Sequence, residues 1–524
     1  MDAAGWHDEG IRLADLGRLE EARSALRRSI DAGGGADALA ALADVRFELG
    51  DTDGASGDLE RAVALRPEDP AIALLDATFL PWVYRDNADL ERWRSRYTDR
   101  LEGFARHAAR YRPQASLVLD LARSNFLLAY QGRDDVGLQR TLGSALRDLL
   151  RHACPRFLEP RKRVARSRIR VGFASAFLYD CTVGRYFGSW IEGLGTAKFE
   201  VVGFMLGAVH DGYTARLARS CVAMHALHAP VLDVAQRIVD ADLDILIYPE
   251  VGMEPRTRLL SCLRLAPVQL AAWGHPETTG SPEIDAYLSC ETMEGPGAAA
   301  HYTEKLLPLP GLGVRYEPPS VPLAFTREEL GIEPGRTVYG CPQSIFKLHP
   351  DSDALFADIL ERDPRAVLLL FQGQNASPEP AKRRVASLAG ALAARGLQGR
   401  GQLRLLAQLS PVDFRRALQA MEVVIDPPHW SGGNTALEAL AMGVPVVAMP
   451  GALMRSRQAA AMLQALGADE CVAATSSAAA DTAVRIAADA GLRRELAGRI
   501  RESRGHLFDD PAPVRSLQAV LGSI

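Results

Sequence analysis

Residues 423–449 read VVIDPPHWSGGNTALEALAMGVPVVAM, and their pattern indicates the fold class. An apolar, β-branched run at Val423–Pro427 is followed by a glycine-containing turn, a helix over Ala436–Met442 and a second apolar run at Val444–Met449. Short strands separated by helices are typical of a parallel sheet with helices on both faces. The stretch therefore predicts strand, helix and strand within one α/β domain.

The same alternation extends toward the N-terminus as far as about residue 168. The other expected strands are Ile169–Ser175, Phe199–Leu206, Leu243–Tyr248, Val268–Trp273, Thr337–Cys341, Ala366–Phe371 and Gln402–Leu406. A segment rich in proline and glycine, 307–322, separates them into two groups. The fold class is therefore α/β, with two doubly wound Rossmann-like domains, at 166–318 and 319–524, that face a ligand cleft at the carboxyl ends of their strands.

The N-terminal part of the chain contains an internal repeat. Leu16-Gly17 recurs as Leu49-Gly50, and Ala22, Leu26 and Ser29 recur as Ala55, Leu59 and Ala62, all with the same offset. Small residues at fixed positions let two antiparallel helices approach closely, and the Leu-Gly pair forms the turn between them. This pattern resembles the tetratricopeptide repeat and predicts an all-α region over 1–80 that binds a protein partner. Further helices, such as Asn87–Arg106 and Ala115–Tyr130, and a basic linker fill 81–165.

Composition excludes several classes of protein. The 524 residues are 48% hydrophobic and 24% charged, as in soluble globular proteins, and the formal net charge is −5. This balance argues against nucleic acid as a partner, and the basic run 161–170 is interpreted as a solvated linker. No apolar run reaches the roughly 18 residues of a membrane span, and the acidic start has no secretory signal. Seven cysteines without a CxxC pair predict reduced thiols in the cytoplasm.

The turn after Val423–Pro427 predicts an anion-binding site. Two glycines let backbone N–H groups approach a phosphate, and the following helix adds the positive end of its dipole. Asn434 and Thr435 add side-chain donors, and Glu438 suits the hydroxyls of a ribose. A capped helix without a ligand is the alternative, and no Walker pattern is present.

Two more loops add charged or titratable side chains at strand ends. Lys347 follows the expected strand Thr337–Cys341 and can neutralise a departing diphosphate. His275 lies between glycine and proline after Val268–Trp273 and can orient a phosphate or assist proton transfer. Taken alone, a surface lysine and a structural histidine remain the alternatives.

Several long motifs, in the same order, resemble glycosyltransferase family 41, which holds protein O-GlcNAc transferases, their SPINDLY-like relatives and bacterial cytoplasmic N-glycosyltransferases. These motifs are Asp244–Met253, Leu263–Gln269, Trp273–Gly280, His301–Leu306 and 430–451. The resemblance covers about 168–524.

The resemblance implies a GT-B fold and inverting, metal-independent transfer of a sugar, with GlcNAc favoured, from a UDP-sugar to Ser or Thr of a protein. It assigns catalytic roles to Lys347 and His275, and needs no cofactor beyond the donor substrate. It implies that the nucleotide-sugar contacts Gln343, Lys347, Phe414, Ser431, Gly432, Gly433, Asn434, Thr435 and Glu438. Transfer of a hexose to Asn is the alternative, because His275 matches the N-glycosyltransferase branch.

One loop departs from the family pattern. Many members have a histidine after the first strand of the catalytic part, whereas Asp180 or Cys181 takes that place here. A catalytically impaired scaffold that binds UDP-sugar is therefore a further alternative. The letters of a metal-binding DxD occur at Asp351-Ser352-Asp353, but they open a helix, where acidic residues are favoured by the dipole. We expect no metal at the donor site.

Overall fold

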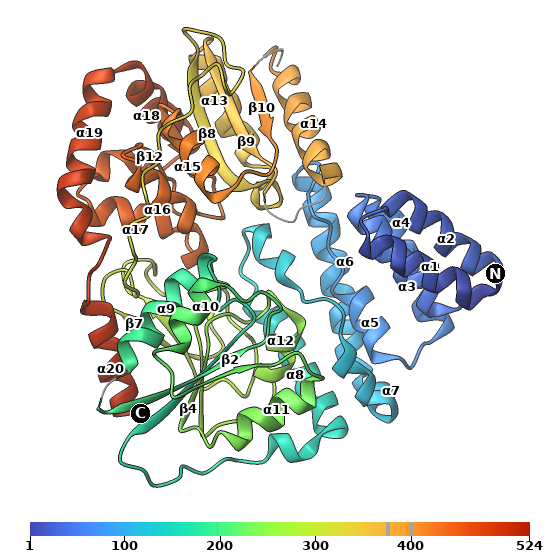
Figure 1. Ribbon diagram of the computed structural model, residues 1–524. Coiled ribbons are helices and arrows are strands. Elements are labelled where there is room, and N and C mark those ends of the chain that lie inside the picture. Colours follow the sequence, from blue (N-terminus) through green and yellow to red (C-terminus); the bar gives the residue numbers. More distant parts are fainter. Residues whose placement is uncertain (196, 374–377, 398–401) are drawn as a thin grey trace.

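Paired helices form the N-terminal region in the computed structural model, which describes residues 1–195, 197–373, 378–397 and 402–524 (Figure 1). Two hairpins come first and pack as successive antiparallel pairs. Their helices are α1 (Ala3–Asp15), α2 (Leu19–Asp31), α3 (Ala36–Glu48) and α4 (Thr52–Leu65).

The turns of the two hairpins have the same geometry. Gly17 and Gly50 have φ values of +72° and +74°, in the left-handed region that glycine adopts without steric cost. The next residue bonds back across each turn: Arg18 N–H donates to the Leu13 carbonyl at 2.9 Å, and the equivalent bond of Asp51 is 2.8 Å. The predicted repeat is therefore confirmed.

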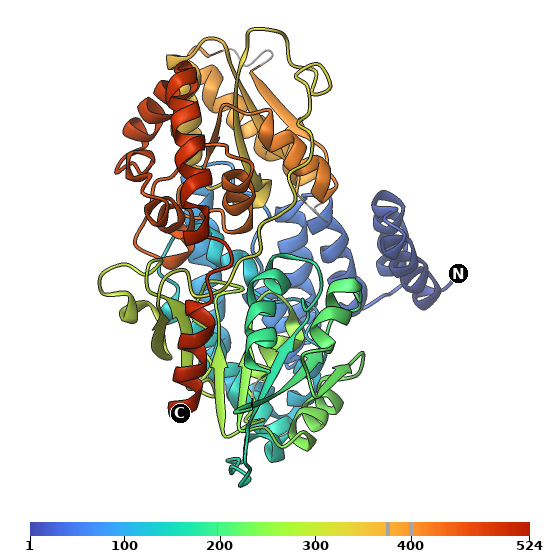
Figure 2. The same cartoon turned by 60° about the vertical axis from the view of Figure 1, so that its left-hand side comes forward.

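The rest of the helical region lies beside both α/β domains (Figures 1 and 2). Its elements are α5 (Pro70–Ala77), α6 (Asn87–Arg106), α7 (Ala108–Tyr111), η1 (Arg112–Asp120), η2 (Phe126–Gln131), α8 (Val136–Ala153) and η3 (Pro155–Leu158). Helix α6 has the predicted bounds. The helix expected over Ala115–Tyr130 is wrong, because two 3₁₀ segments occupy this stretch and bury Val118 and Leu128 completely. Tertiary packing overrides local helical preference there.

The N-terminal α/β domain contains a seven-stranded parallel sheet of order β3-β2-β1-β4-β5-β6-β7. Its strands are β1 (Ile169–Ser175), β2 (Phe199–Met205), β3 (Ala223–Ala226), β4 (Ile245–Tyr248), β5 (Val268–Ala271), β6 (Ala286–Cys290) and β7 (Lys305–Leu309). Its helices are α9 (Thr182–Leu194), α10 (Gly212–Ala218), α11 (Val231–Asp240), α12 (Pro255–Ser261) and η4 (Ala298–His301). The sequence did not predict β3, β6 or β7. Strand β7 lies at the edge of the sheet, where Pro308 is tolerated.

The C-terminal α/β domain contains a five-stranded parallel sheet of order β10-β9-β8-β11-β12. Its strands are β8 (Thr337–Ser344), β9 (Ala366–Phe371), β10 (Leu403–Leu406), β11 (Val423–Ile425) and β12 (Val446–Val447). Its helical elements are η5 (Ile345–Lys347), α13 (Ser352–Arg362), α14 (Pro378–Ala394), α15 (Pro411–Gln419), α16 (Asn434–Ala441), η6 (Met454–Ser456), α17 (Gln458–Ala465), η7 (Asp469–Cys471), α18 (Ser476–Ala488), α19 (Ala490–Ser503) and η8 (Arg504–His506). The expected fold class of two doubly wound domains after a helical region is confirmed.

In each sheet the strand order reverses at one point, between β1 and β4 and between β8 and β11. Such switch points form crevices at the carboxyl ends of the strands, where α/β proteins bind ligands. The loops after β1, β8 and β11 are those that hold most of the predicted site residues.

Contacts between the parts fix these crevices relative to one another. Helix α20 (Ala512–Ser523) returns from the C-terminal α/β domain to the N-terminal one, and Gln518 donates to the Gly193 carbonyl at 2.8 Å (Figure 1). Asp135 of the helical region accepts from Arg455 at 2.8 Å, and Arg455 lies 4.0 Å from Glu277 of the N-terminal α/β domain. All three parts thus meet in one buried polar cluster.

Arginines of the basic run 161–170 pair with acidic side chains of the N-terminal α/β domain. Arg168 and Arg170 both pair with Glu200, and Arg166 pairs with Asp242, so these charges are neutralised within the domain. Of the helices in the described part of the chain, none combines the length and the apolar character needed to cross a bilayer.

Candidate active site

A cleft of about 280 Å³ lies where the loops after β1, β8 and β11 converge. Residues from both α/β domains line it. Those that the sequence singled out are Asp180, Cys181, Lys347, Phe414, Asn434, Thr435 and Glu438. The structure therefore brings seven of the predicted residues to one surface. The predicted residues outside the cleft lining are Gln343, Ser431, Gly432, Gly433 and His275.

Asp426, just beyond β11, holds the glycine-containing turn in shape. Its carboxylate accepts from the Ser431 hydroxyl and from the Gly432 N–H, both at 2.6 Å. Burial raises the pKa of Asp426 to about 7. Ser431 is itself buried and accepts from the Ala459 N–H at 2.8 Å. Ser431 and Gly432 thus stabilise the turn itself and do not line the cleft.

The open start of α16 faces the cleft after this turn. Gly433 is the N-cap and offers no side chain to the first N–H groups of the helix, so these donors remain available to a ligand. Gln343 donates to the Thr435 hydroxyl at 3.0 Å and fixes it beside these donors. An anion placed here meets several donors at once.

Lys347 ends η5 at the carboxyl end of β8 and supplies a full positive charge. Its Nζ lies 5.5 Å from the Trp430 ring centroid and 5.8 Å from that of Phe346. Within the described part of the chain no carboxylate reaches it. Burial alone lowers its pKa to about 8. The ammonium is therefore held against aromatic faces, and an anionic ligand would stabilise it.

Phe414 projects from α15 at another wall of the cleft. Its ring centroid is 5.4 Å from that of Phe371, with the planes at 70°. Its half-buried face is available for a planar group.

Glu438 is held by two arginines that the sequence did not single out for this role. Its Oε1 lies 3.3 Å from Arg415 and 3.5 Å from Arg185. Burial is the main influence on Glu438, and it raises the pKa. Arg185 also bonds Asp180 at 2.6 Å, so this arginine joins the loop after β1 to α16 across the cleft.

Asp180 and Cys181 differ in what they can do at the position of the missing histidine. Burial raises the pKa of the Cys181 thiol to about 11, and the thiol donates to the Phe177 carbonyl. It is therefore protonated and a poor proton acceptor at neutral pH. Asp180 is half exposed and presents a carboxylate that is paired with Arg185.

His275 lies behind the cleft lining, among aromatic rings. Its ring is 6.1 Å from that of Trp430 and 6.5 Å from that of Tyr130, and the side chain is 2% exposed. Burial first, and then the charges of Arg258 and Arg455, lower the pKa of His275 to about 3. Burial thus favours the neutral imidazole, and the catalytic role of His275 stays a prediction.

The two carboxylates of the Asp351-Ser352-Asp353 sequence point to different partners. Asp353 pairs with Arg384, which is buried. Asp351 bonds His429. They do not converge on the cleft, so their geometry does not fit a shared metal bound to a diphosphate.

Residues 313–512 match the family model described as "Glycosyl transferase family 41". Two plant proteins are similar, each named a probable UDP-N-acetylglucosamine–peptide N-acetylglucosaminyltransferase. SEC of Arabidopsis thaliana is 26% identical over 57% of this chain and 31% of its own length. SPINDLY of Solanum lycopersicum is 26% identical over 50% of this chain and 28% of its own length. The chain thus spans less than a third of these curated relatives.

A solved structure, a mutant O-GlcNAc transferase of Thermobaculum terrenum, shares the arrangement of the whole chain. It covers 99% of this chain and 96% of its own, with a TM-score of 0.72 and 24% sequence identity. This likeness confirms the GT-B fold with a tetratricopeptide-like region. The family match covers residues 313–512, within the domain that supplies most of the residues lining the cleft.

Proposed function

We propose that the chain is an inverting, metal-independent glycosyltransferase that moves a sugar, with GlcNAc favoured, from a UDP-sugar to a Ser or Thr side chain of a protein. The names of the curated relatives support UDP-GlcNAc as donor and a peptide as acceptor. The donor diphosphate lies between Lys347 and the start of α16, the ribose hydroxyls meet Glu438, and the uracil stacks on Phe414.

One observation carries this proposal: Lys347 faces the cleft with no carboxylate partner among the described residues, next to the uncapped N-terminus of α16. When the bond between sugar and diphosphate breaks, negative charge develops on the departing UDP. Preorganised positive groups that meet such charge lower the barrier, because they need no reorganisation at the moment of reaction. Lys347 and the N–H groups of α16 supply this charge in place of a metal ion.

The acceptor side of the proposal involves the N-terminal α/β domain and the helical repeats. Asp180 is the cleft residue of that domain with a carboxylate, so it is the group placed to receive or orient the acceptor proton. His275 packs beside Trp430, whose ring contacts the Lys347 ammonium, and can orient the donor phosphate or assist proton transfer. The repeats engage the acceptor protein, as extended helical stacks do. We place this activity in the cytoplasm, which agrees with seven free cysteines.

The test is a transfer assay with the full chain, UDP-GlcNAc or UDP-glucose, and a protein extract as acceptor. We expect incorporation of N-acetylhexosamine, read by intact mass, that alkaline β-elimination removes because it is linked through Ser or Thr. Incorporation of a hexose that resists elimination would instead establish transfer to Asn. UDP binding without transfer to any protein would favour the scaffold alternative.

A further inference from the structure

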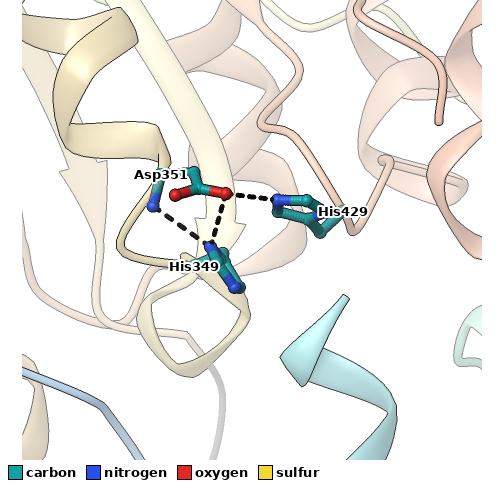
Figure 3. A group of neighbouring side chains, drawn as sticks. All are labelled: His349, Asp351 and His429. Atoms are coloured by element: carbon teal, nitrogen blue, oxygen red, sulfur yellow. Dashed lines mark hydrogen bonds and ion pairs between the residues drawn. The ribbon is translucent and has the colours of Figure 1, made fainter. Parts of the chain in front are cut away.

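Two histidines and an aspartate meet outside the cleft, in the C-terminal α/β domain (Figure 3). His349 and Asp351 lie between η5 and α13, and His429 lies in the turn after β11. The potential ligand atoms of the three side chains all lie within 4.8 Å of one another. None of the three lines the cleft, and the proposed reaction uses none of them.

The distances in this cluster bracket the spacing between the ligands of one metal ion. Asp351 Oδ2 lies 2.8 Å from His429 Nε2 and 3.4 Å from His349 Nδ1. Ligands about 2.0–2.1 Å from a tetrahedral ion are about 3.3 Å from each other. The rings of the two histidines have centroids 4.2 Å apart, so they face the same carboxylate from neighbouring positions.

The protonation state of His349 also suits the role of a metal ligand. The Asp351 N–H donates to His349 Nδ1 at 3.1 Å, so this nitrogen carries a lone pair and no proton (Figure 3). A bound ion would take this lone pair in place of the amide hydrogen.

Neighbouring residues orient the ligands from outside. Asn87, at the start of α6, donates to Asp351 Oδ1 at 2.8 Å and leaves Oδ2 toward the two imidazoles. A Cβ on Gly132 would lie 2.6 Å from His429 Cγ, so the helical region packs directly against this ring. Hydrogen bonds that orient metal-binding carboxylates are typical of metal sites. Asp351 is 45% exposed, and an ion can reach it from solvent.

The donor set selects the kind of ion. Two imidazole nitrogens and one carboxylate oxygen suit Zn²⁺, Co²⁺ or Ni²⁺, whereas Mg²⁺ and Ca²⁺ prefer oxygen ligands alone. We propose that His349, Asp351 and His429 bind one divalent transition-metal ion, with Zn²⁺ as the natural occupant and water completing its coordination.

Such an ion would hold together the segments that support the donor site. His349 is two residues from Lys347, and His429 is adjacent to Trp430 and two residues from Ser431. Through Asn87 the ion would also join these segments to the helical region. Its role is structural and separate from any cation on the diphosphate, so the proposal stands independently of the proposed function.

The experiment is a Co²⁺ and Zn²⁺ titration of the EDTA-treated full chain, followed by calorimetry and by the visible d–d absorption of Co²⁺. We expect the wild type to bind one more equivalent than His429→Gln or Asp351→Asn. Asn87→Ala should bind this equivalent about 10- to 100-fold more weakly, because the hydrogen bond that orients the carboxylate is lost. His210→Gln, at an exposed histidine beside His228, controls for adventitious binding and should keep the extra equivalent.

Thermal unfolding provides a second measurement. Saturating Zn²⁺ should raise the Tm of the wild type and of His210→Gln, and should leave that of His429→Gln unchanged. Circular dichroism of the metal-free variants identifies any variant that fails to fold. If a cluster variant fails, the weaker metal binding expected of Asn87→Ala becomes the test of the proposal. Equal stoichiometry and affinity in the wild type and in the folded cluster variants would overturn the proposal and leave an ordinary His-Asp-His hydrogen-bonded cluster.

Discussion

Replacing Lys347 by methionine should stabilise the ligand-free protein while it nearly abolishes transfer. The substitution removes the ammonium and keeps an unbranched side chain against Phe346 and Trp430. Loss of one preorganised group that stabilises developing charge costs about 10²–10³ in rate, or about 3–4 kcal/mol. Lys382→Met is the matched control, because Lys382 is exposed, pairs with Glu379 at 2.6 Å and does not line the cleft.

The stability effect follows from the pKa. Burial lowers the pKa of Lys347 from 10.5 to about 8, which corresponds to about 3 kcal/mol of destabilisation when the amine is charged. The two aromatic contacts return about 0.5–1 kcal/mol each, so the variant should gain about 1–2 kcal/mol at neutral pH. The unfolded chain binds the proton more tightly than the folded one. The wild type therefore recovers stability as the pH rises from about 8 to 10.5. The difference in Tm between the wild type and Lys347→Met should vanish at pH 10.5.

The assays are initial rates of transfer, thermal melts from pH 7 to 10.5, and calorimetry of UDP binding in buffers of different ionisation enthalpy. A bound diphosphate should raise the pKa of Lys347, so the wild type should take up about half a proton at pH 8, where its amine is half protonated. The methionine variant should take up none. Transfer by Lys347→Met at the wild-type rate, or equal proton uptake by both proteins, would refute the role assigned to this lysine.

Four further changes test other parts of the site. Glu438→Gln should weaken UDP binding in calorimetry about 10- to 100-fold and lower the Tm, because buried Arg415 loses its carboxylate partner; unchanged affinity would separate Glu438 from the ribose. His275→Gln should remove a loss of stability that the wild type shows as the pH falls from 6.5 toward 3, because the unfolded imidazole binds a proton that the buried one excludes. Melts at several pH values measure this, and parallel curves for both proteins would contradict it. Excess Mg²⁺ should leave the Kd for UDP unchanged, and a marked strengthening would favour a metal on the diphosphate. Removal of 1–34, whose hairpin shares a small core with Leu42 and Val45 of α3, should spare UDP binding and weaken modification of proteins; equal loss of both would make the hairpin part of the stability of the catalytic core.

Local patterns predicted most of the architecture. Strands β1 and β9 and helix α6 have the bounds read from the sequence, because apolar periodicity and turn residues act over a few positions. The edge strand β7 was missed because Pro308 and its neighbours look like a linker. Short β3 and β6 were missed because pairing with a neighbouring strand, and not their own composition, makes them strands.

Local sequence patterns were sufficient to predict the helical repeat, the two parallel sheets and the loops that carry Lys347 and the turn 431–435. These features depend on residues close together in the chain. The long-range contacts, in contrast, appear only once the chain is folded: Arg185 pairs with Glu438, His275 is buried beside Trp430 with a lowered pKa, and Asp135 accepts a hydrogen bond from Arg455. Burial and ion pairing depend on which distant segments pack together. A histidine or glutamate has the same letter whether it faces water, a cation or an aromatic ring, and its chemistry is set by that surrounding.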